Sequence, residues 1–387
     1  MTTRKTGTYI SNTLSGEEVK AFVPYPLPPD PPISMTEELT KLLEVTSQNC
    51  RLLNLAAQMV PDRDWFIYGF VRKEAVVSSQ IEGTQATLLD LVEAESLSDA
   101  EKPADVNEVV NYVNALNSCI KELSNPKGLP LSLRLIKKAH AILMRGVRGK
   151  HKSPGEFRQS QNWIGGDRPG NASFVPPPVA SLPTCLNDFE TYLHTADELP
   201  ALLRIALLHV QFETIHPFLD GNGRVGRLLI TLLLNEWKLL EAPLLYLSLY
   251  FKRNRAEYYH RLAAVRTEGD WEGWIKFFLD GVNSVALESA DAARQLYAIV
   301  RAARERVLSH KRASVIGVRL LEILPQVPVI TIGQAVKLLS TTKPTAQKAL
   351  ELLVDLNVLE EISGRERGKK FAFRKYLDCL TEGTQAL

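Results

Sequence analysis

The sequence predicts a mainly helical protein with a short strand hairpin near its middle and a small unit at its C-terminal end. Three observations predict this fold class. Apolar residues recur at helical spacing from residue 36 to about residue 312. One Gly- and Pro-rich stretch, residues 153–178, breaks that period with two short apolar runs. Residues 313–387 follow a pattern of their own, two helices and then two strands.

Composition sets the outer limits on function. The 387 residues suffice for two or three domains, and 45% hydrophobic with 23% charged residues is ordinary for a globular protein. A net charge of +2 gives no global attraction to nucleic acid or membrane. The four cysteines lack CxxC spacing, which argues against a disulfide framework or a zinc ribbon. No stretch has the apolar character of a signal peptide or a membrane span, so we expect a cytoplasmic protein without a membrane partner.

The N-terminal third is expected to be extended first and helical afterwards. Residues 1–35 read as a flexible entry followed by the Pro-rich stretch FVPYPLPPDPPISM, whose prolines cannot supply helix or ladder hydrogen bonds. Residues 36–100 form the next predicted unit, of N-terminal helices. Helical spacing predicts helices over 36–59, 66–83, 107–123 and 132–146.

The middle of the chain predicts a hairpin and then more helices. The runs NWI (162–164) and SFV (173–175) flank GGDRPGNA, which is the pattern of two strands joined by a long tip. Helices are expected again from Pro183, and the charged segment 284–312 reads as a connector helix.

The decapeptide IHPFLDGNGR (215–224) lies between two stretches so apolar that both are expected to be buried helices. Its glycines allow successive backbone N–H groups to converge on one anion at the N-terminus of the second helix. Arg224 and Arg227 lie on one side of the first turn of that helix and can bind phosphate oxygens. Asp220 offers a hard oxygen to Mg²⁺, and His216 a neutral imidazole to take a proton. This combination favours phosphoryl or nucleotidyl transfer.

A structural alternative exists for each of these residues. GNG can be a tight interhelical turn, and no GxxxxGK[ST] loop is present. Arginines at helical spacing are more often a solvated face, but here the remaining face of the helix is Leu and Ile, so burying them without an anion would be costly. His209 and His216 lie seven residues apart, roughly 10 Å on a helix, which is too far to share one metal ion. His209 is therefore interpreted as a hydrogen-bonded core histidine.

The segment HPFLDGNGRVGR, His216 to Arg227, resembles the signature of Fic-domain proteins, HPFx[D/E]GNGRxxR, at every defined position. The resemblance continues in PGEFR, in NWIGG…FVPPP and in YFKRNRAEYYHRLAAVRTEGDW, and covers about Leu131 to Val282. It implies a Fic-type helical catalytic core, expected over 101–283.

The resemblance also implies an activity: transfer of AMP from ATP to a Tyr, Thr or Ser hydroxyl of a target protein or of the enzyme itself, with release of pyrophosphate. His216 is then the general base, Asp220 holds Mg²⁺, and Phe218 packs inward and fixes the loop. Arg224 would meet the β-phosphate and Arg227 the γ-phosphate. The implied ATP- and phosphate-binding residues are Gly221, Asn222, Gly223, Arg224, Val225, Gly226 and Arg227.

Two further parts of the site follow from the same resemblance. The hairpin becomes a flap that aligns the target by adding a strand to its edge; its residues are Trp163, Ile164, Gly165, Phe174 and Val175. Tyr258 and Tyr259 resemble residues that line the adenine pocket, with plain core packing as the equal alternative.

The hexapeptide SSQIEG (78–83) matches [S/T]xxxE[G/N], the inhibitory motif of the same family. Ser78 and Glu82 are four residues apart and share a helix face, and Gly83 permits close approach to another element. A bidentate Glu82–Arg227 pair would occupy the place of the γ-phosphate and misplace the α-phosphate, and about 1 Å of misplacement can cost on the order of a hundredfold in rate. The sequence thus predicts an enzyme with low basal activity.

Residues 313–387 resemble a winged helix-turn-helix, a fold whose second helix often enters the DNA major groove. DNA binding and protein docking are equally compatible with it, because acidic residues dilute its positive charge. On the first alternative the groove-facing residues would be Lys343, Thr345, Gln347 and Lys348, and the wing cations Arg365, Arg367, Lys369 and Lys370.

Other functions stay open at this point. One is a DNA-binding transcriptional regulator that uses the pocket as a nucleotide sensor, although a sensor has no need of His216. Another is an enzyme of this type that removes AMP, with the inhibitory glutamate orienting water, or that transfers another phosphate-containing group. The target protein, the modified hydroxyl and a homodimer are also left open by the sequence.

Overall fold

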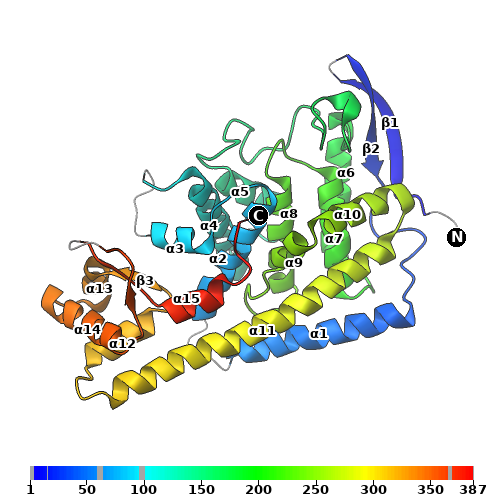
Figure 1. Cartoon of the computed structure of the whole chain (residues 1–387). Coiled ribbons are helices and arrows are strands. Elements are labelled where there is room, and N and C mark those ends of the chain that lie inside the picture. The colour runs from blue at the N-terminus through cyan, green and yellow to red at the C-terminus, as the bar shows by residue number, and fades with distance from the viewer. Residues whose placement is uncertain (1–3, 15, 59–63, 96–100, 365–367, 387) are drawn as a thin grey trace.

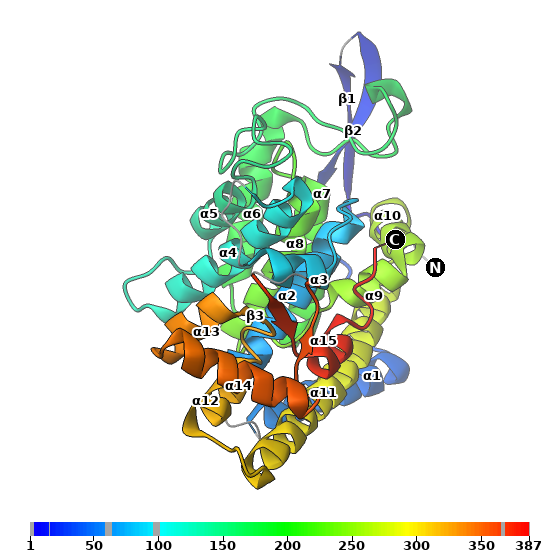
Figure 2. The same cartoon turned by 60° about the vertical axis from the view of Figure 1, so that its left-hand side comes forward.

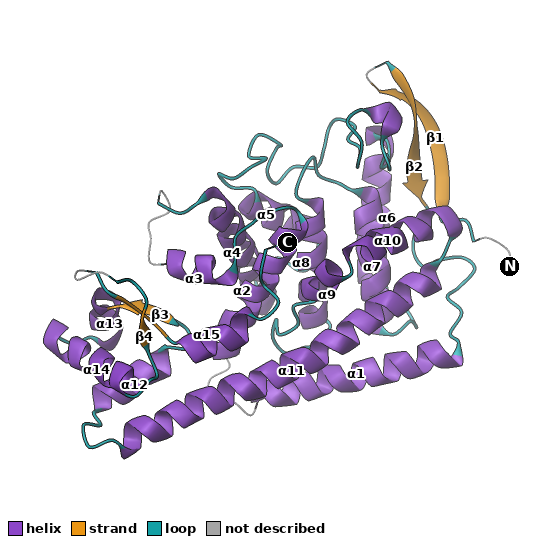
Figure 3. Cartoon of the chain, in the orientation of Figure 1, coloured by secondary structure: helices purple, strands orange, loops and turns teal. Residues whose placement is uncertain are grey.

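In a computed structural model of the chain, which describes residues 4–14, 16–58, 64–95, 101–364 and 368–386, helices dominate and strands occur only at the two extremities (Figure 3). A two-stranded hairpin projects at one end, and a small sheet lies within the C-terminal unit at the other (Figure 1). The predicted fold class, mainly helical, is confirmed.

The N-terminal segment differs from the extended entry that we expected. Strands β1 (Gly7–Leu14) and β2 (Glu17–Pro24) pair antiparallel in full register, from Gly7 opposite Pro24 to Leu14 opposite Glu17. Alternation explains the hairpin, since Val19 and Ala21 of β2 are buried while Glu18 and Lys20 between them are exposed. The Pro-rich residues that follow Pro24 have no helix or strand before Glu37, as predicted.

Among the described residues, five helices precede the central part of the chain, and four of them follow the predicted periodicity. The additional one, α3, was not predicted, although Thr87 and Asp90 form a complete capping box at its start. Met59 and residues 60–63, at the end of the first predicted helix and after it, lie outside the described residues. The helices are α1 (Glu37–Gln58), α2 (Asp64–Ile81), α3 (Leu88–Ala94), α4 (Ala104–Ser124) and α5 (Leu133–Leu143).

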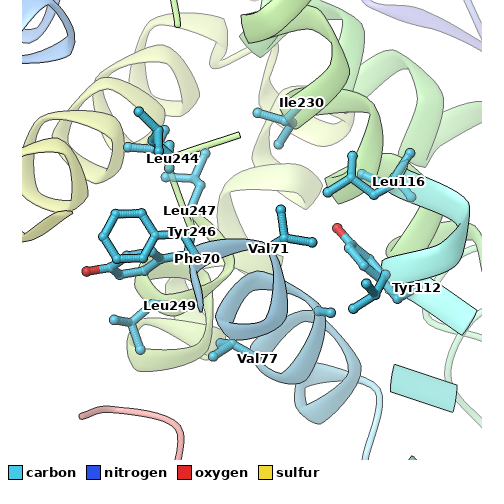
Figure 4. Packing of buried hydrophobic residues seen from close by; sticks show 14 of the residues in the cluster. Phe70, Val71, Val77, Tyr112, Leu116, Ile230, Leu244, Tyr246, Leu247 and Leu249 are labelled. Atoms are coloured by element: carbon cyan, nitrogen blue, oxygen red, sulfur yellow. The ribbon is translucent and has the colours of Figure 1, made fainter. Parts of the chain in front are cut away.

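Helix α2 lies at the centre of the core, and nearly all of its side chains are buried. Figure 4 shows Phe70, Val71 and Val77 of this helix between α4, represented by Tyr112 and Leu116, and the segment 244–249. A helix that is buried on all sides is a rigid support for whatever its C-terminal end presents.

The predicted hairpin in the middle of the chain is reduced to one bridge. Ile164 and Phe174 exchange both backbone hydrogen bonds, at 2.8 and 3.1 Å, and the tip between them contains a short 3₁₀ turn, Pro169–Asn171. A second 3₁₀ turn, Val179–Ser181, leads into α6 (Leu182–His194).

The remaining helices of the core enclose the central decapeptide. Helix α11 runs unbroken from Trp271 to Ser309, so residue 284, where we expected a connector to begin, lies inside a continuous helix. In Figure 1 α1 lies alongside α11 over much of its length, and Asn49 donates to Asn283 at 2.7 Å between them. These helices are α7 (Ala201–Ile215), α8 (Asn222–Glu236), α9 (Ser248–Arg253), α10 (Arg255–Glu268) and α11 (Trp271–Ser309).

The C-terminal residues form a unit around the far end of α11 (Figure 2). Its sheet has three strands in the order β3-β5-β4, both pairs antiparallel, one strand more than the predicted two-stranded wing. The elements are α12 (Val315–Ile323), β3 (Val329–Thr331), α13 (Ile332–Leu339), α14 (Lys343–Asp355), β4 (Glu360–Glu361), β5 (Lys370–Ala372) and α15 (Arg374–Thr381). The assignment as a winged helix-turn-helix stays a prediction.

The residues that would contact DNA, on that alternative, differ in their surroundings. On α14, Lys343, Gln347 and Lys348 are exposed and Thr345 is half-buried. Lys369 pairs with Glu361 at 3.2 Å and Lys370 with Glu93 of α3 at 3.5 Å, so these two wing cations already have partners within the chain. Arg365 and Arg367 lie outside the described residues.

After α15 the chain turns back toward α2 and α9, and its described residues 383–386 contact both helices. Thr384 is 2% exposed, and its carbonyl oxygen accepts a hydrogen bond from Gln80 Nε2 of α2 at 2.8 Å. The Lys252 ammonium of α9 bonds to the Gln385 carbonyl and, at 2.7 Å, to Gln80 Oε1. We call residues 383–386 the tail. No helix within the described residues is both long and apolar enough to span a membrane.

Candidate functional site

The decapeptide forms the sharp connection between α7 and α8. Helix α7 ends at His216, whose backbone is left-handed (φ 49°, ψ 60°), and Gly221 precedes α8 with φ 77°. Left-handed backbone is strained for most residues and free for glycine. The two positions turn the chain within six residues, so that the first backbone N–H groups of α8 face outward from the helix start.

Side chains inside the loop hold it in shape. Phe218 is fully buried and stacks on His140 of α5, with ring centroids 3.8 Å apart. Asn222 is 2% exposed, and its side chain makes two hydrogen bonds to the Phe218 backbone: Nδ2 donates to Phe218 O and Oδ1 accepts from Phe218 N, both at 2.8 Å. Phe218 therefore packs as predicted, but the Asn222 side chain serves the loop, and only its backbone N–H is left for a phosphate.

His140 is a supporting residue that the sequence reasoning missed. Its Nε2 lies 3.0 Å from the Asp220 carbonyl oxygen, and its Nδ1 accepts a hydrogen bond from Gly155 N at 2.8 Å. Burial lowers its pKa to about 4, so the ring is neutral near pH 7. It fixes the far side of the loop from 80 residues away in the chain.

Arg227 is bound by the SSQIEG segment. Its Nε donates to Ser78 Oγ at 2.9 Å, and its Nη2 donates to Ser78 O at 2.9 Å and to Glu82 Oε1 at 2.7 Å. The expected bidentate pair with Glu82 is thus wrong: Ser78 takes one edge of the guanidinium, so the glutamate receives a single strong bond. Glu82 itself follows the last residue of α2, and Gly83 comes next with φ 96°.

The Glu82 carboxylate also covers the start of α8. A Cβ added to Gly223 would meet Glu82 Oε1 at 2.3 Å and Arg227 Nη1 at 3.0 Å, so only glycine allows this approach. Burial raises the pKa of Glu82, but the Arg227 charge and hydrogen bond more than offset this, and the net pKa is lowered. An ionised carboxylate therefore lies at the positive end of α8, where an anion is most stable.

Arg224, one turn earlier on α8, has a different partner. Its Nη1 is 3.3 Å from Glu108 Oε2, and its Nη2 approaches Met144 Sδ at 3.5 Å. Both charged side chains are buried, at 5% and 3% exposure. Glu108 was not found from the sequence, because one Glu on an amphipathic helix gives no sign of a partner 116 residues away.

The His216 imidazole is positioned by its own backbone. The carbonyl oxygen of His216 accepts from Arg158 Nε at 3.0 Å, and its Nδ1 is buried with no hydrogen-bond partner among the described residues. Burial, then the nearby Arg158 charge, lower its pKa to about 4. The ring is therefore neutral at physiological pH and able to accept a proton.

A second carboxyl group, Glu213, lies one turn before His216. Its Oε1 is buried, has no hydrogen-bond partner among the described residues, and lies 2.2 Å from where a Gly226 Cβ would be. Burial raises its pKa to about 7 despite the opposing charge of Arg227. Of the other predicted phosphate-binding residues, Val225 is buried, with 1% exposure, so it can offer only its backbone.

Asp220 is the expected Mg²⁺ ligand. Its Oδ1 accepts from Gly221 N at 2.6 Å, and its Oδ2 lies beside Gly149. Within the described ranges no group of three or more His, Cys, Asp or Glu side chains is arranged to hold a metal ion. One carboxylate beside an anion cradle fits Mg²⁺, which commonly binds through one or two carboxylates together with substrate phosphates and water.

The flap residues fall into two sets. Trp163 and Ile164 are about one-third exposed, whereas Phe174 and Val175 are buried. Strand β2 runs beside the buried arm, since Phe22 N donates to Val175 O at 2.9 Å. The exposed arm is therefore the one left for an added strand, and Gly165, with φ 68°, begins the tip.

The two tyrosines suggested for adenine binding are also placed differently. Tyr258 is 1% exposed, stacks on Phe251 at 4.4 Å, and its hydroxyl lies 2.8 Å from His209 Nε2. His209 Nδ1 is 3.2 Å from Gly226 O, which confirms His209 as a satisfied core histidine. Tyr259 is 43% exposed with the Arg255 guanidinium over its ring at 5.4 Å, so it is the more accessible of the two.

Two regions of the chain, one of them containing the central loop, match known protein families. Residues 130–234 match the Fic/DOC family. Residues 40–121 match the Fic/DOC family N-terminal region, so the matched ranges include the central loop, Glu82 and Glu108.

Two curated relatives and two solved structures are similar to the chain. Over 194 residues it is 31% identical to the protein adenylyltransferase Fic of Drosophila grimshawi (49% of this chain, 35% of the relative), and over 214 residues 30% identical to that of Drosophila willistoni (52% and 38%). It thus spans little more than a third of either relative. A Fic family protein from Desulfovibrio desulfuricans G20 is 22% identical with a TM-score of 0.57, over 88% of this chain and 97% of that one. Fic-1 (residues 134–508) of C. elegans is 20% identical with a TM-score of 0.50, over 66% and 73%. The two structural likenesses show a shared fold.

Proposed function

We propose that this protein is an adenylyltransferase that transfers AMP from ATP to a side-chain hydroxyl of a protein, and that Glu82 restrains it. One observation carries the proposal: a carboxylate lies on Arg227 at the start of α8, in a cradle of glycine backbone, buried guanidinium and neutral imidazole. Such a cradle binds an oxyanion, and the proteins named adenylyltransferase that resemble this chain supply the choice of nucleotide.

The proposed reaction assigns one role to each group. The target hydroxyl oxygen forms a bond to the α-phosphorus while the bond from that phosphorus to the β-phosphate oxygen breaks, and pyrophosphate leaves. His216 takes the hydroxyl proton, as its lowered pKa allows. The α8 amides and Arg224 bind the phosphates and stabilise the developing charge. Mg²⁺, held by Asp220 and the phosphates, would neutralise charge on the leaving group.

The inhibitory role of Glu82 follows from competition for one cation. Ser78 and Glu82 engage Nε and Nη2 of Arg227, so this edge of the guanidinium is not available to a γ-phosphate. The Glu82 side chain is 36% exposed, so it can leave its position without disturbing the buried part of α2. Release of this carboxylate would free Arg227 and let ATP bind with its α-phosphate aligned.

The test uses Glu82→Gly with ATP labelled on the α-phosphate. We expect this variant to label itself or proteins of a lysate far more strongly than wild type, and His216→Ala in the same background to abolish the label. Mass spectrometry of the labelled residue should show an added AMP. Labelling at the wild-type level would refute the restraint, and transfer that persists without His216 would remove it from the role of base.

A further inference from the structure

Behind the phosphate cradle lies a second buried carboxylate, Glu108 of α4, which is 3% exposed. Oε2 lies 3.3 Å from Arg224 Nη1 and accepts a hydrogen bond from Thr84 Oγ1 at 3.2 Å. Oε1 lies 3.3 Å from Nε of Arg148, which is largely exposed. A buried carboxylate needs such partners, and removal of either member of a buried pair leaves an uncompensated charge.

The pairing leaves one donor of Arg224 free. Nη1 faces Glu108 and Nη2 faces Met144 Sδ, whereas Nε is buried and has no hydrogen-bond partner among the described residues. A buried donor without an acceptor is unfavourable, so this position favours a ligand that supplies one. The charge of Arg224 also lowers the pKa of Glu82, so the guanidinium acts electrostatically on the same cradle.

The two buried arginines of α8 thus pair with carboxylates that differ in how firmly they are held. Glu82 follows the end of a helix, is partly exposed, and can be displaced from Arg227. Glu108 is in the second turn of a 21-residue helix and is held by three groups, so it stays with Arg224 when an anion arrives. Fixed by Glu108, the guanidinium keeps one orientation and loses little freedom on binding.

We propose that Glu108 is a positioning residue that orients Arg224 toward a phosphate beyond the α-phosphate, and so selects polyphosphates over the monophosphate. This inference rests on the proposed function and deepens it. Thr84, two residues after Glu82, links the same carboxylate to the end of the inhibitory segment, so the fixed and the displaceable carboxylates belong to one hydrogen-bonded assembly.

The experiment measures calorimetric affinities for ADP and AMP, in the presence of magnesium, with Glu108→Gln in the Glu82→Gly background. ADP binding is expected to weaken about tenfold, because an interaction with a charged group is lost, whereas AMP binding changes less than about twofold. Glu122→Gln is the matched control: Glu122 lies on the same helix, pairs with Lys138, and touches no part of the cradle. It should leave both affinities unchanged.

A double-mutant cycle separates positioning from general damage. With Arg224 already replaced by Ala, Glu108→Gln should no longer change ADP affinity, whereas a purely structural role predicts the same loss again. Thr84→Val, which removes one hydrogen bond and keeps the shape, gives a milder selective loss and replaces Glu108→Gln if that variant does not fold. Equal losses for ADP and AMP, or no loss for either, would overturn the proposal.

The outcomes distinguish this inference from the function on which it rests. If Glu82→Gly transfers no AMP, the proposed transferase activity is refuted, but the ratio of ADP to AMP affinity still tests the positioning role of Glu108. If Glu82→Gly transfers AMP and that ratio is unchanged by Glu108→Gln, only the positioning role of Glu108 falls.

Discussion

The tail contacts the segment that carries Glu82 from outside the site, so its removal tests the proposed restraint. Residues 383–386 supply two carbonyl oxygens, of Thr384 to Gln80 and of Gln385 to Lys252. Gln80 lies in α2 between Ser78 and Glu82, and its Nε2 also donates to Ala86 O at 2.9 Å, just beyond the inhibitory motif. Deletion of residues 383–387 therefore removes the hydrogen bonds that anchor Lys252 and Gln80, the latter two residues before Glu82 in the chain.

The lost hydrogen bonds set the expected rise in basal labelling. A neutral hydrogen bond contributes about 1 kcal/mol and one to a charged group about 1.5–3 kcal/mol, and water that enters after the deletion returns part of this. A net loss of about 1.5–2 kcal/mol, if borne by the restrained state, raises the population of released Glu82 by roughly ten- to thirtyfold. We expect basal self-labelling to rise by about that factor and to stay below the level of Glu82→Gly.

The assay compares labelling by wild type, the deletion, Glu82→Gly and the combination, with circular dichroism to verify folding. The combination should label no more than Glu82→Gly alone, because no restraint is left to remove. Lys252→Met, which keeps the aliphatic stem and removes the ammonium, should give a smaller rise. A deletion variant that folds but labels like wild type, or one that still adds to Glu82→Gly, would refute the link between tail and restraint.

Three other predictions follow from burial and pKa shifts. Labelling by Glu82→Gly should stay level from about pH 8 to about pH 5.5 and fall only near pH 4. The reason is that the pKa of His216 is about 4, so its ring is neutral above that value, and loss of the Glu82 charge lowers this pKa further. An inflection near the ordinary histidine pKa of about 6.5 would contradict this prediction. Tyr258→Phe should lower the free energy of unfolding by about 1–3 kcal/mol in denaturant titrations by leaving His209 without its partner, whereas Tyr259→Ala should raise the KM for ATP at an unchanged midpoint. Trp274→Ala should lower the free energy of unfolding by about 3–5 kcal/mol, since the ring is fully buried and its Nε1 donates to a backbone carbonyl at 2.9 Å; a loss below about 1 kcal/mol would show that the core refills the space.

Features that depend on neighbours in the chain were accessible from the sequence. The helical class came from periodicity, and the cradle came from glycines and arginines within twelve residues. Glu82 could be paired with Arg227 only because the motif was already known, since the two are 145 residues apart. The single hydrogen bond between them, in place of a bidentate pair, depends on where α2 ends, which spacing alone does not determine.

What the sequence did not reveal has two different causes. Glu108 and His140 act through partners 116 and 80 residues away, and nothing in their local sequence differs from an ordinary buried helix face. The N-terminal hairpin and α3 did leave signals: alternation in EEVKAFVP, and a capping box at Thr87. The hairpin was overlooked because the neighbouring prolines dominated that stretch, and α3 because only seven residues carry it.

The order of the restraint and its target along the chain has a consequence for the life of each molecule. Ribosomes add about 5–20 residues per second and domains fold from the N-terminus onward. Glu82 therefore leaves the ribosome roughly seven to thirty seconds before Arg227, which follows 145 residues later. In a nascent polypeptide the Glu82 carboxylate is therefore present before the Arg227 guanidinium with which it pairs, so the proposed restraint would act as soon as the site folds.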